Sequence, residues 1–182
     1  MRVVIALSLA ASFAGSQAFA GEYVVNGNFD ENLAGWQHTS SDVTWSATDS
    51  DGSPASGSMR FDVSSGIVAQ QCISSVTGGL YVESFDGKID PETFGDAYIA
   101  GYLTAYSTSD CTGAPLQEAW TFIQEESATF EPASVYLNAP GATHSVGVAF
   151  VVMPTNEAIA FVDSVSVGKV ADSIFENGFE QP

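Results

Sequence analysis

The sequence predicts an all-β protein, an antiparallel β-sandwich of the jelly-roll kind. Short runs with an apolar residue at every second position recur from end to end, and this is the spacing of a half-buried strand. Gly, Ser, Pro, Asn and Asp separate the runs, as turn residues do. No window of the sequence has sustained helical periodicity. One apolar face per strand is the pattern of two sheets packed face to face.

The first residues are excluded from this fold. Arg2 is their one charge, an apolar run follows, and Ala18-Phe19-Ala20 has the pattern of a cleavage site, so residues 1–20 are predicted to be a secretory signal peptide. The run is shorter than the roughly 18 residues that span a bilayer. We expect an exported protein that does not span a membrane and that is extracellular, on the cell surface or in the periplasm. It would have one sandwich domain over residues 21–169 and a tail over 170–182.

The strands follow in order along the chain. Alternating runs predict strands over residues 43–48, 58–63, 98–106, 145–152 and 161–167. Trp45 alternates in phase with Val43 and is therefore expected in the core. Trp36 is also expected to be buried, while the sequence leaves the side of Trp120 open.

Charge limits the classes of partner. The chain has 22 acidic residues against 4 Lys and Arg, a net charge of −18 at pH 7. A field of this sign repels nucleic acid, and no basic patch is present to bind phosphates. We interpret the acidic residues as a solvated surface, with local cation binding as the alternative.

Two cysteines, Cys72 and Cys111, are present in a chain predicted to be exported, and this favours one disulfide. The disulfide would close a loop of about 40 residues. It would contribute about 4 kcal/mol to the stability of the fold if its main effect is the lower chain entropy of the unfolded state. No nucleophile or metalloprotease motif appears. Glu125 and Glu126, as sequence neighbours, would point to opposite faces of a strand, which does not suit a carboxylate pair. We expect that the protein is not an enzyme.

A line of tyrosines suggests a binding surface. Tyr98, Tyr102 and Tyr106 share one face of a predicted strand, at intervals of about 13 to 14 Å. Rings with exposed hydroxyls suit sugars, which offer C–H groups to an aromatic face and hydroxyls to polar groups. The polar candidates are Gln70, Glu83 and Gln124. Alternatively, the tyrosines are ordinary strand formers beneath loops. Tyr81 and Tyr136 are likewise expected on outer faces.

Four stretches resemble one family. They are "NGNFDENLAGW" (26–36), "YLTAYSTSDCTGAPL" (102–116), "LNAPGATHSVGVAFVV" (137–152) and "AIAFVDSVSV" (158–167). In this order they resemble carbohydrate-binding modules of families 4, 9 and 22, which have a galactose-binding-domain-like jelly roll. The resemblance implies a secreted, non-catalytic module that binds a polysaccharide or cell-surface glycan. The alternative is a structural or adhesive surface protein that uses the sandwich without binding sugar. The tail "IFENGFE" resembles a C-terminal signature of exported bacterial proteins.

The resemblance also implies a structural calcium. Carried over by position, its ligands are Asp30, Asp163 and backbone carbonyls of the loop over residues 49–57. In the sequence Asp163 is in phase with Phe161 and Val165 on an apolar face, where a carboxylate needs a partner. Calcium accepts such a mixture of oxygen ligands. The alternative is that Asp163 accepts hydrogen bonds from backbone amides without metal.

Overall fold

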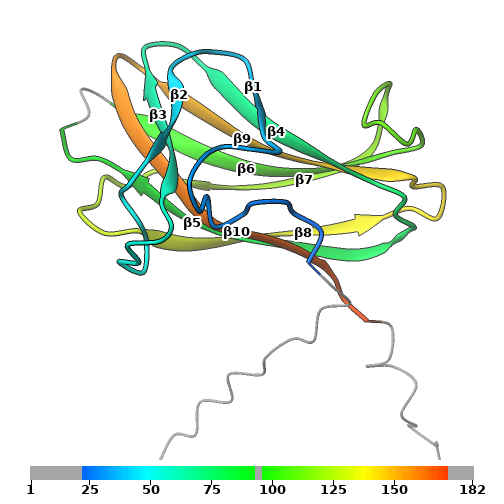
Figure 1. The fold of residues 1–182 in the computed structure, drawn as a ribbon. Coiled ribbons are helices and arrows are strands. Elements are labelled where there is room, and N and C mark those ends of the chain that lie inside the picture. Colours follow the sequence, from blue (N-terminus) through cyan, green and yellow to red (C-terminus); the bar gives the residue numbers. More distant parts are fainter. Residues whose placement is uncertain (1–21, 93–95, 172–182) are drawn as a thin grey trace, which may run out of the picture.

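The structure, a computed structural model, describes residues 22–92 and 96–171 and confirms the antiparallel sandwich (Figure 1). Two five-stranded sheets pack face to face, and the described residues contain no helix. Sheet I has the order β1 (Gln37–His38), β4 (Ile67–Ser74), β9 (Ser145–Pro154), β6 (Ala97–Tyr106) and β7 (Pro115–Ile123). Sheet II has the order β2 (Val43–Ser46), β3 (Ser58–Val63), β10 (Ala158–Lys169), β5 (Gly79–Ile89) and β8 (Glu131–Ala139).

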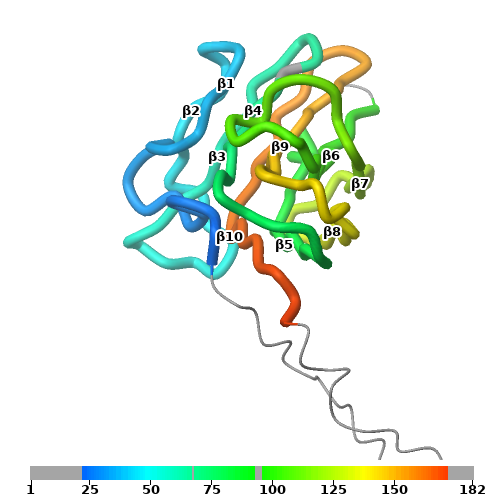
Figure 2. The backbone as a smooth tube through the Cα atoms, turned by 90° about the vertical axis from the view of Figure 1, so that its right-hand side faces the viewer, coloured from blue at the N-terminus to red at the C-terminus, as the bar shows by residue number. Residues whose placement is uncertain are grey.

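The two ends of the described chain lie on the same side of the molecule (Figure 2). The amide of Tyr23 donates to the carbonyl of Val167 at 3.0 Å, which places the first described residues beside β10. The predicted signal peptide, residues 1–20, and most of the predicted tail, residues 172–182, lie outside the described residues. Within those that are described, no helix has the length and apolar character needed to cross a membrane.

The core lies between the sheets and follows the predicted alternation. On β3 and β9 the inward residues are those that the sequence indicated, and all are buried: Met59, Phe61, Val63, Val146, Val148, Phe150 and Val152. Phe150 lies at the centre, with the ring of Phe85 edge-on at 4.9 Å and that of Trp36 at 5.7 Å. A side chain on Gly101 would start 2.5 Å from the Phe85 ring. A glycine at this point of β6 therefore lets Phe85 cross from the other sheet.

The opening stretch contributes two rings to the core. Phe29 is fully buried and Trp36 is 6% exposed, which confirms the burial of Trp36. The indole N–H of Trp36 donates to the carbonyl of Asn26. Gly27 lies directly against β10, where its carbonyl accepts from the amide of Val165 at 2.9 Å. The motif thus packs two rings into the core, and the backbone contact between Gly27 and Val165 holds it against β10.

The phase predicted for the last strand is wrong in its first half. β10 changes register between Asp163 and Ser166, and Ser164 has a φ of +50°, as in a β-bulge. Before the bulge Val162 faces the core, whereas within it Val165 does. Asp163 therefore lies on the outer face of sheet II and is buried by other means. A single inserted residue inverts the alternation, and no periodicity reveals it.

Two aromatic residues differ from expectation. Trp45 is in phase with Val43, as predicted, and lies opposite the buried Met59, but it is 38% exposed because β2 is an edge strand; its indole N–H donates to the carbonyl of Phe29. Tyr81 is 1% exposed and faces the core, where its hydroxyl donates to the carbonyl of Thr77 at 2.7 Å. A bonded hydroxyl lets tyrosine take an inward position.

Candidate functional site

One row of side chains crosses all five strands on the outer face of sheet I. The register places Tyr102 on β6 opposite Trp120 on β7 and Ala149 on β9. Ala149 is opposite Gln70 on β4, which is opposite Gln37 on β1. The face therefore has rings at one side, a small residue in the middle and amides at the other side.

The rings form an aromatic platform, made of Tyr98, Tyr102, Trp120 and Phe122. Trp120 and Phe122 are 58% and 46% exposed, and their rings stack at 5.6 Å with an interplanar angle of 21°. Met153, 42% exposed, lies opposite Tyr98. Contiguous exposed apolar side chains of this kind mark interaction sites on soluble proteins.

The face ends at a loop, residues 107–114, which we call the crossing loop. The structure confirms the disulfide between Cys72 on β4 and Cys111 in this loop, with a Cα–Cα distance of 5.8 Å. The hydroxyl of Ser145 on β9 donates to the carbonyl of Thr108 and accepts from the amide of Cys111. The loop is thus fastened to two strands of the face.

Below the loop lies a pocket of about 230 Å³, which we call the end pocket. Its lining residues come from five segments of the chain and are Gln37, Gln70, Gln71, Cys72, Thr104, Tyr106, Asp110, Cys111, Thr112, Gly147, Val148 and Ala149. Gly147 lies beside the ring of Tyr106, and a side chain there would start 3.2 Å from that ring. The pocket therefore offers amide, hydroxyl and carboxylate groups above a floor of small residues.

The Lys and Arg side chains of the described residues lie on one sheet only. Arg60, Lys88 and Lys169, the basic side chains of the described residues, all belong to strands of sheet II. No Lys, Arg or His is among the described residues that line the end pocket. Asp110 in the crossing loop accepts from the hydroxyl of Thr112 at 2.7 Å, and this bond lowers the pKa of Asp110. The pocket therefore carries a negative charge.

Five of the six predicted ligand residues lie on or beside this face. Tyr98, Tyr102 and Tyr106 are half-buried on the outer face. The residues that alternate with them on β6 point inward to the core. Gln70 is exposed in the same row as Tyr102. Gln124 follows β7 and lines an open pocket together with Tyr98. Their role in binding is untested and stays a prediction.

The prediction that Glu83 contributes to the binding face is wrong. It lies on β5 in the other sheet, it is fully buried, and neither carboxylate oxygen has a hydrogen-bond partner. Burial raises the pKa of Glu83 well above its ordinary value. A side chain between the sheets cannot reach a ligand on an outer surface.

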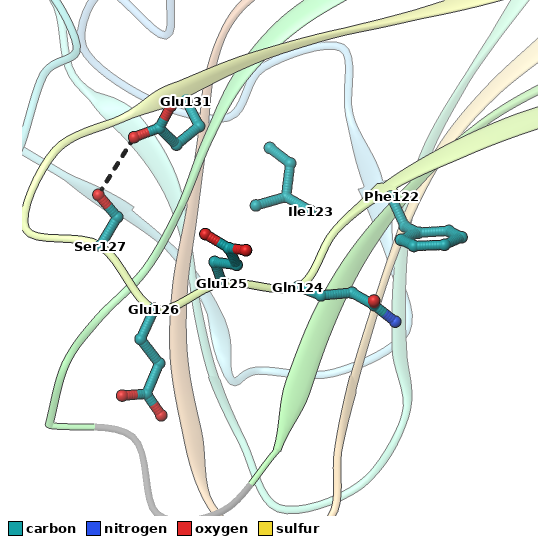
Figure 3. Close-up of a pocket in the computed structure, with 7 residues that line it drawn as sticks. All are labelled: Phe122, Ile123, Gln124, Glu125, Glu126, Ser127 and Glu131. Carbon is teal, nitrogen blue, oxygen red and sulfur yellow. Dashed lines mark hydrogen bonds between the residues drawn. The ribbon is translucent and has the colours of Figure 1, made fainter.

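The acidic residues after β7 do not form a facing pair. Glu125, Glu126 and Glu131 line an open pocket of about 440 Å³ (Figure 3). Glu125 and Glu126 point in opposite directions, as expected from their adjacency, and the hydroxyl of Ser127 donates to Glu131.

The residues predicted to hold calcium are only partly assembled. Asp163 is 2% exposed, and its two oxygens accept from the amides of Ser50 and Ser164. Burial is the main cause that raises the pKa of Asp163, and the charge of Asp49 adds to it. These carboxylates and nearby hydroxyls are hard oxygen donors of the kind that calcium uses. Asp30, however, is exposed, and no group of three or more acidic, His or Cys side chains suited to a metal occurs within residues 22–92 and 96–171. Calcium stays a prediction.

Sequence reasoning missed part of the face. The sequence does not assign Phe122 or Trp120 to a face, because an edge strand with polar and apolar residues on both faces has no clear phase. The crossing loop and Asp110 were also missed. A signal was present: Cys72 alternates in phase with Gln70 on β4, so a disulfide at Cys72 must bring its partner to the face of Gln70.

Known structures share this fold, although no family model and no curated protein matches the sequence. A family 61 carbohydrate-binding module in complex with β-1,4-galactotriose superposes with a TM-score of 0.61 at 14% identity, over 82% of this chain and 99% of that one. The family 22 xylan-binding domain of Paenibacillus barcinonensis Xyn10C superposes with a TM-score of 0.57 at 12% identity, over 86% and 97%.

The chain has the fold of carbohydrate-binding modules. The identities are low, so the likeness concerns the fold. An arabinose-bound α-L-arabinofuranosidase contains the same fold as one part, since this chain matches 27% of that chain at a TM-score of 0.56. The carbohydrate-binding-module fold therefore occurs in these structures both as a separate unit and within an enzyme chain.

Proposed function

We propose that the protein is an exported, non-catalytic module that binds a polysaccharide or cell-surface glycan on the outer face of sheet I. The observation that carries the proposal is the aromatic platform, in which the exposed, stacked rings of Trp120 and Phe122 lie beside Tyr102. The amides of Gln37 and Gln70 lie across the same face. Rings that pack on sugar C–H groups, with polar groups at fixed positions beside them, are what a sugar site requires.

Export is supported by two observations of different kinds. Residues 1–20 have the composition of a signal peptide, and the chain forms a disulfide, which persists in oxidising compartments. The alternative function, a surface scaffold that binds no sugar, uses the same sandwich and differs in leaving the platform without a ligand.

The test is retention on insoluble β-1,4-galactan, xylan and mixed-linkage β-glucan, with Trp120→Ala as the decisive variant. We expect at least one polymer to retain the protein, and Trp120→Ala to weaken this binding about tenfold or more, because a central aromatic contact contributes about 2 kcal/mol. Tyr136→Ala is the matched control. Tyr136 is 59% exposed, close to the 58% of Trp120, but lies on β8 of sheet II. Absence of retention on all three polymers by the folded protein would favour the scaffold.

A further inference from the structure

The crossing loop takes an unusual route for a connection between neighbouring strands. β6 and β7 are hydrogen-bonded neighbours, and such hairpins close with roughly two to five residues. Residues 107–114 instead extend sideways over β9, because Cys111 is bonded to Cys72 on β4 and β9 lies between β4 and β6. The chain therefore lies across the outer face of sheet I.

Ser145 demonstrates that the loop covers the sheet. It is opposite Tyr106 and Ser74, both on the outer face, yet its exposed fraction is 0%. Its hydroxyl bonds to two backbone groups of the loop, the carbonyl of Thr108 at 2.7 Å and the amide of Cys111 at 3.0 Å. The loop is a fixed barrier at this end of the strands.

The end pocket lies between this barrier and the aromatic platform. Thr104 and Gly147 line it and are opposite each other, one row beyond the row of Tyr102 and Ala149. Two residues of strand span about 7 Å, which is enough for one sugar unit but not for two. A glycan chain that lies on the platform along β6 reaches the barrier after one more unit.

We propose that the end pocket receives the terminal sugar of an uncharged polysaccharide and that the crossing loop prevents the chain from continuing. This inference rests on the proposed function. Asp110 excludes acidic sugars, because its carboxylate lies in a pocket where no described residue supplies a positive charge. Gln37, Gln70 and Thr112 present neutral polar groups that can bond the hydroxyls of an uncharged terminal unit.

The inference is tested by the number of chain ends, with β-1,4-galactan, xylan and mixed-linkage β-glucan as the probes. Each polymer is compared intact and after partial cleavage by an endo-acting glycosidase, at equal mass and with both forms insoluble. We expect the saturating amount of bound protein to rise in proportion to the number of chain ends. A capacity that follows polymer mass and not chain ends would overturn the inference.

Two variants examine the loop directly. Releasing it with Cys72→Ser and Cys111→Ser together is expected to allow internal binding, so that the capacity no longer depends on chain ends. Because this variant loses a disulfide and could fail to fold, Asp110→Ala is the second one. In salt that screens the net charge of the whole protein, we expect the parent protein to reject the uronate polymer polygalacturonate and Asp110→Ala to bind it. Ser109→Ala, also exposed in the loop but not lining the pocket, should reject it as the parent does. Polygalacturonate binding by the parent, or its continued rejection by Asp110→Ala, would contradict the charge argument.

The outcomes separate the two levels of the proposal. Binding that Trp120→Ala weakens, but that is unrelated to chain ends, overturns end recognition and leaves the glycan-binding function in place. Absence of binding to every polymer by the folded protein overturns both.

Discussion

At the scale of single residues, the buried carboxyl of Glu83 is the clearest conflict between chemistry and position. It lies on β5 opposite Val167 and Val135 and has no hydrogen-bond partner. An ionised carboxylate in such a place costs far more than a neutral one, so the folded protein holds Glu83 protonated while the unfolded chain ionises it above its ordinary pKa. The pKa is raised by folding, so Glu83 opposes stability increasingly as pH rises.

Glu83→Gln should therefore change the pH dependence of stability. Between the ordinary pKa of 4.5 and the raised folded-state pKa, the native protein binds one more proton at this site than the unfolded chain, and stability falls by up to about 1.4 kcal/mol per pH unit. The Glu83→Gln variant has no carboxyl group at this position and therefore does not lose stability in this way as the pH rises. Urea unfolding should give similar midpoints at pH 4.5 and a clearly higher midpoint for the variant at pH 8. Glu118→Gln removes an exposed carboxylate on β7, and its urea midpoint should differ from that of the parent protein by the same amount at both pH values. If the difference for Glu83→Gln is also the same at both pH values, Glu83 does not have a raised pKa in the folded protein.

At the scale of elements, the opening motif and the bulge of β10 depend on each other. The amide of Val165, which lies within the bulge, donates to the carbonyl of Gly27, and Ser164 adopts the positive φ that turns the strand there. A Cβ at Gly27 would collide with the carbonyl oxygen of Val165. The glycine of the motif is thus required by the close approach of two backbones.

Gly27→Ala is expected to destabilise the fold by about 1 to 3 kcal/mol, as overpacking of a close contact does. The measurement is the free energy of unfolding in urea. Gly141→Ala is the matched control, because nothing lies within 4 Å of a Cβ at that position, and it should change stability little. An equal and small effect for both variants would mean that the Gly27 contact does not constrain the motif.

At the scale of the whole molecule, the charge is strongly negative and unevenly distributed. The net charge is −18, and the described residues form two ion pairs, Arg60 with Asp62 and Lys88 with Asp90, both on the side of sheet II. Self-repulsion of this kind destabilises a compact state, so cations of any sort should stabilise the protein by screening. A specifically bound cation adds to that effect through its affinity for the folded state.

Calcium binding by Asp163 and Asp30 is tested against this background. We expect the thermal midpoint to be higher in calcium chloride than in sodium chloride of equal ionic strength, because the buried Asp163 lies near the charge of Asp49. Asp163→Asn and Asp30→Asn should each lose the calcium-specific increase. An equal loss of stability by Asp163→Asn in calcium and in chelator would instead support the hydrogen-bonded alternative, in which the amides of Ser50 and Ser164 suffice.

The sequence by itself determined the sandwich, the burial of β3 and β9, the disulfide and the shared face of Tyr98, Tyr102 and Tyr106, because period-two alternation and cysteine count are local properties of the chain. Tertiary structure decided the rest. Glu83 faces the core together with its strand neighbours Tyr81 and Phe85. A polar residue is expected on the outer face, so the sequence pattern did not predict this inward position. The bulge moved Asp163 to the other face. The row from Trp120 to Gln37, and the loop that closes it, exist only through strand order and register, which bring together residues far apart in the sequence.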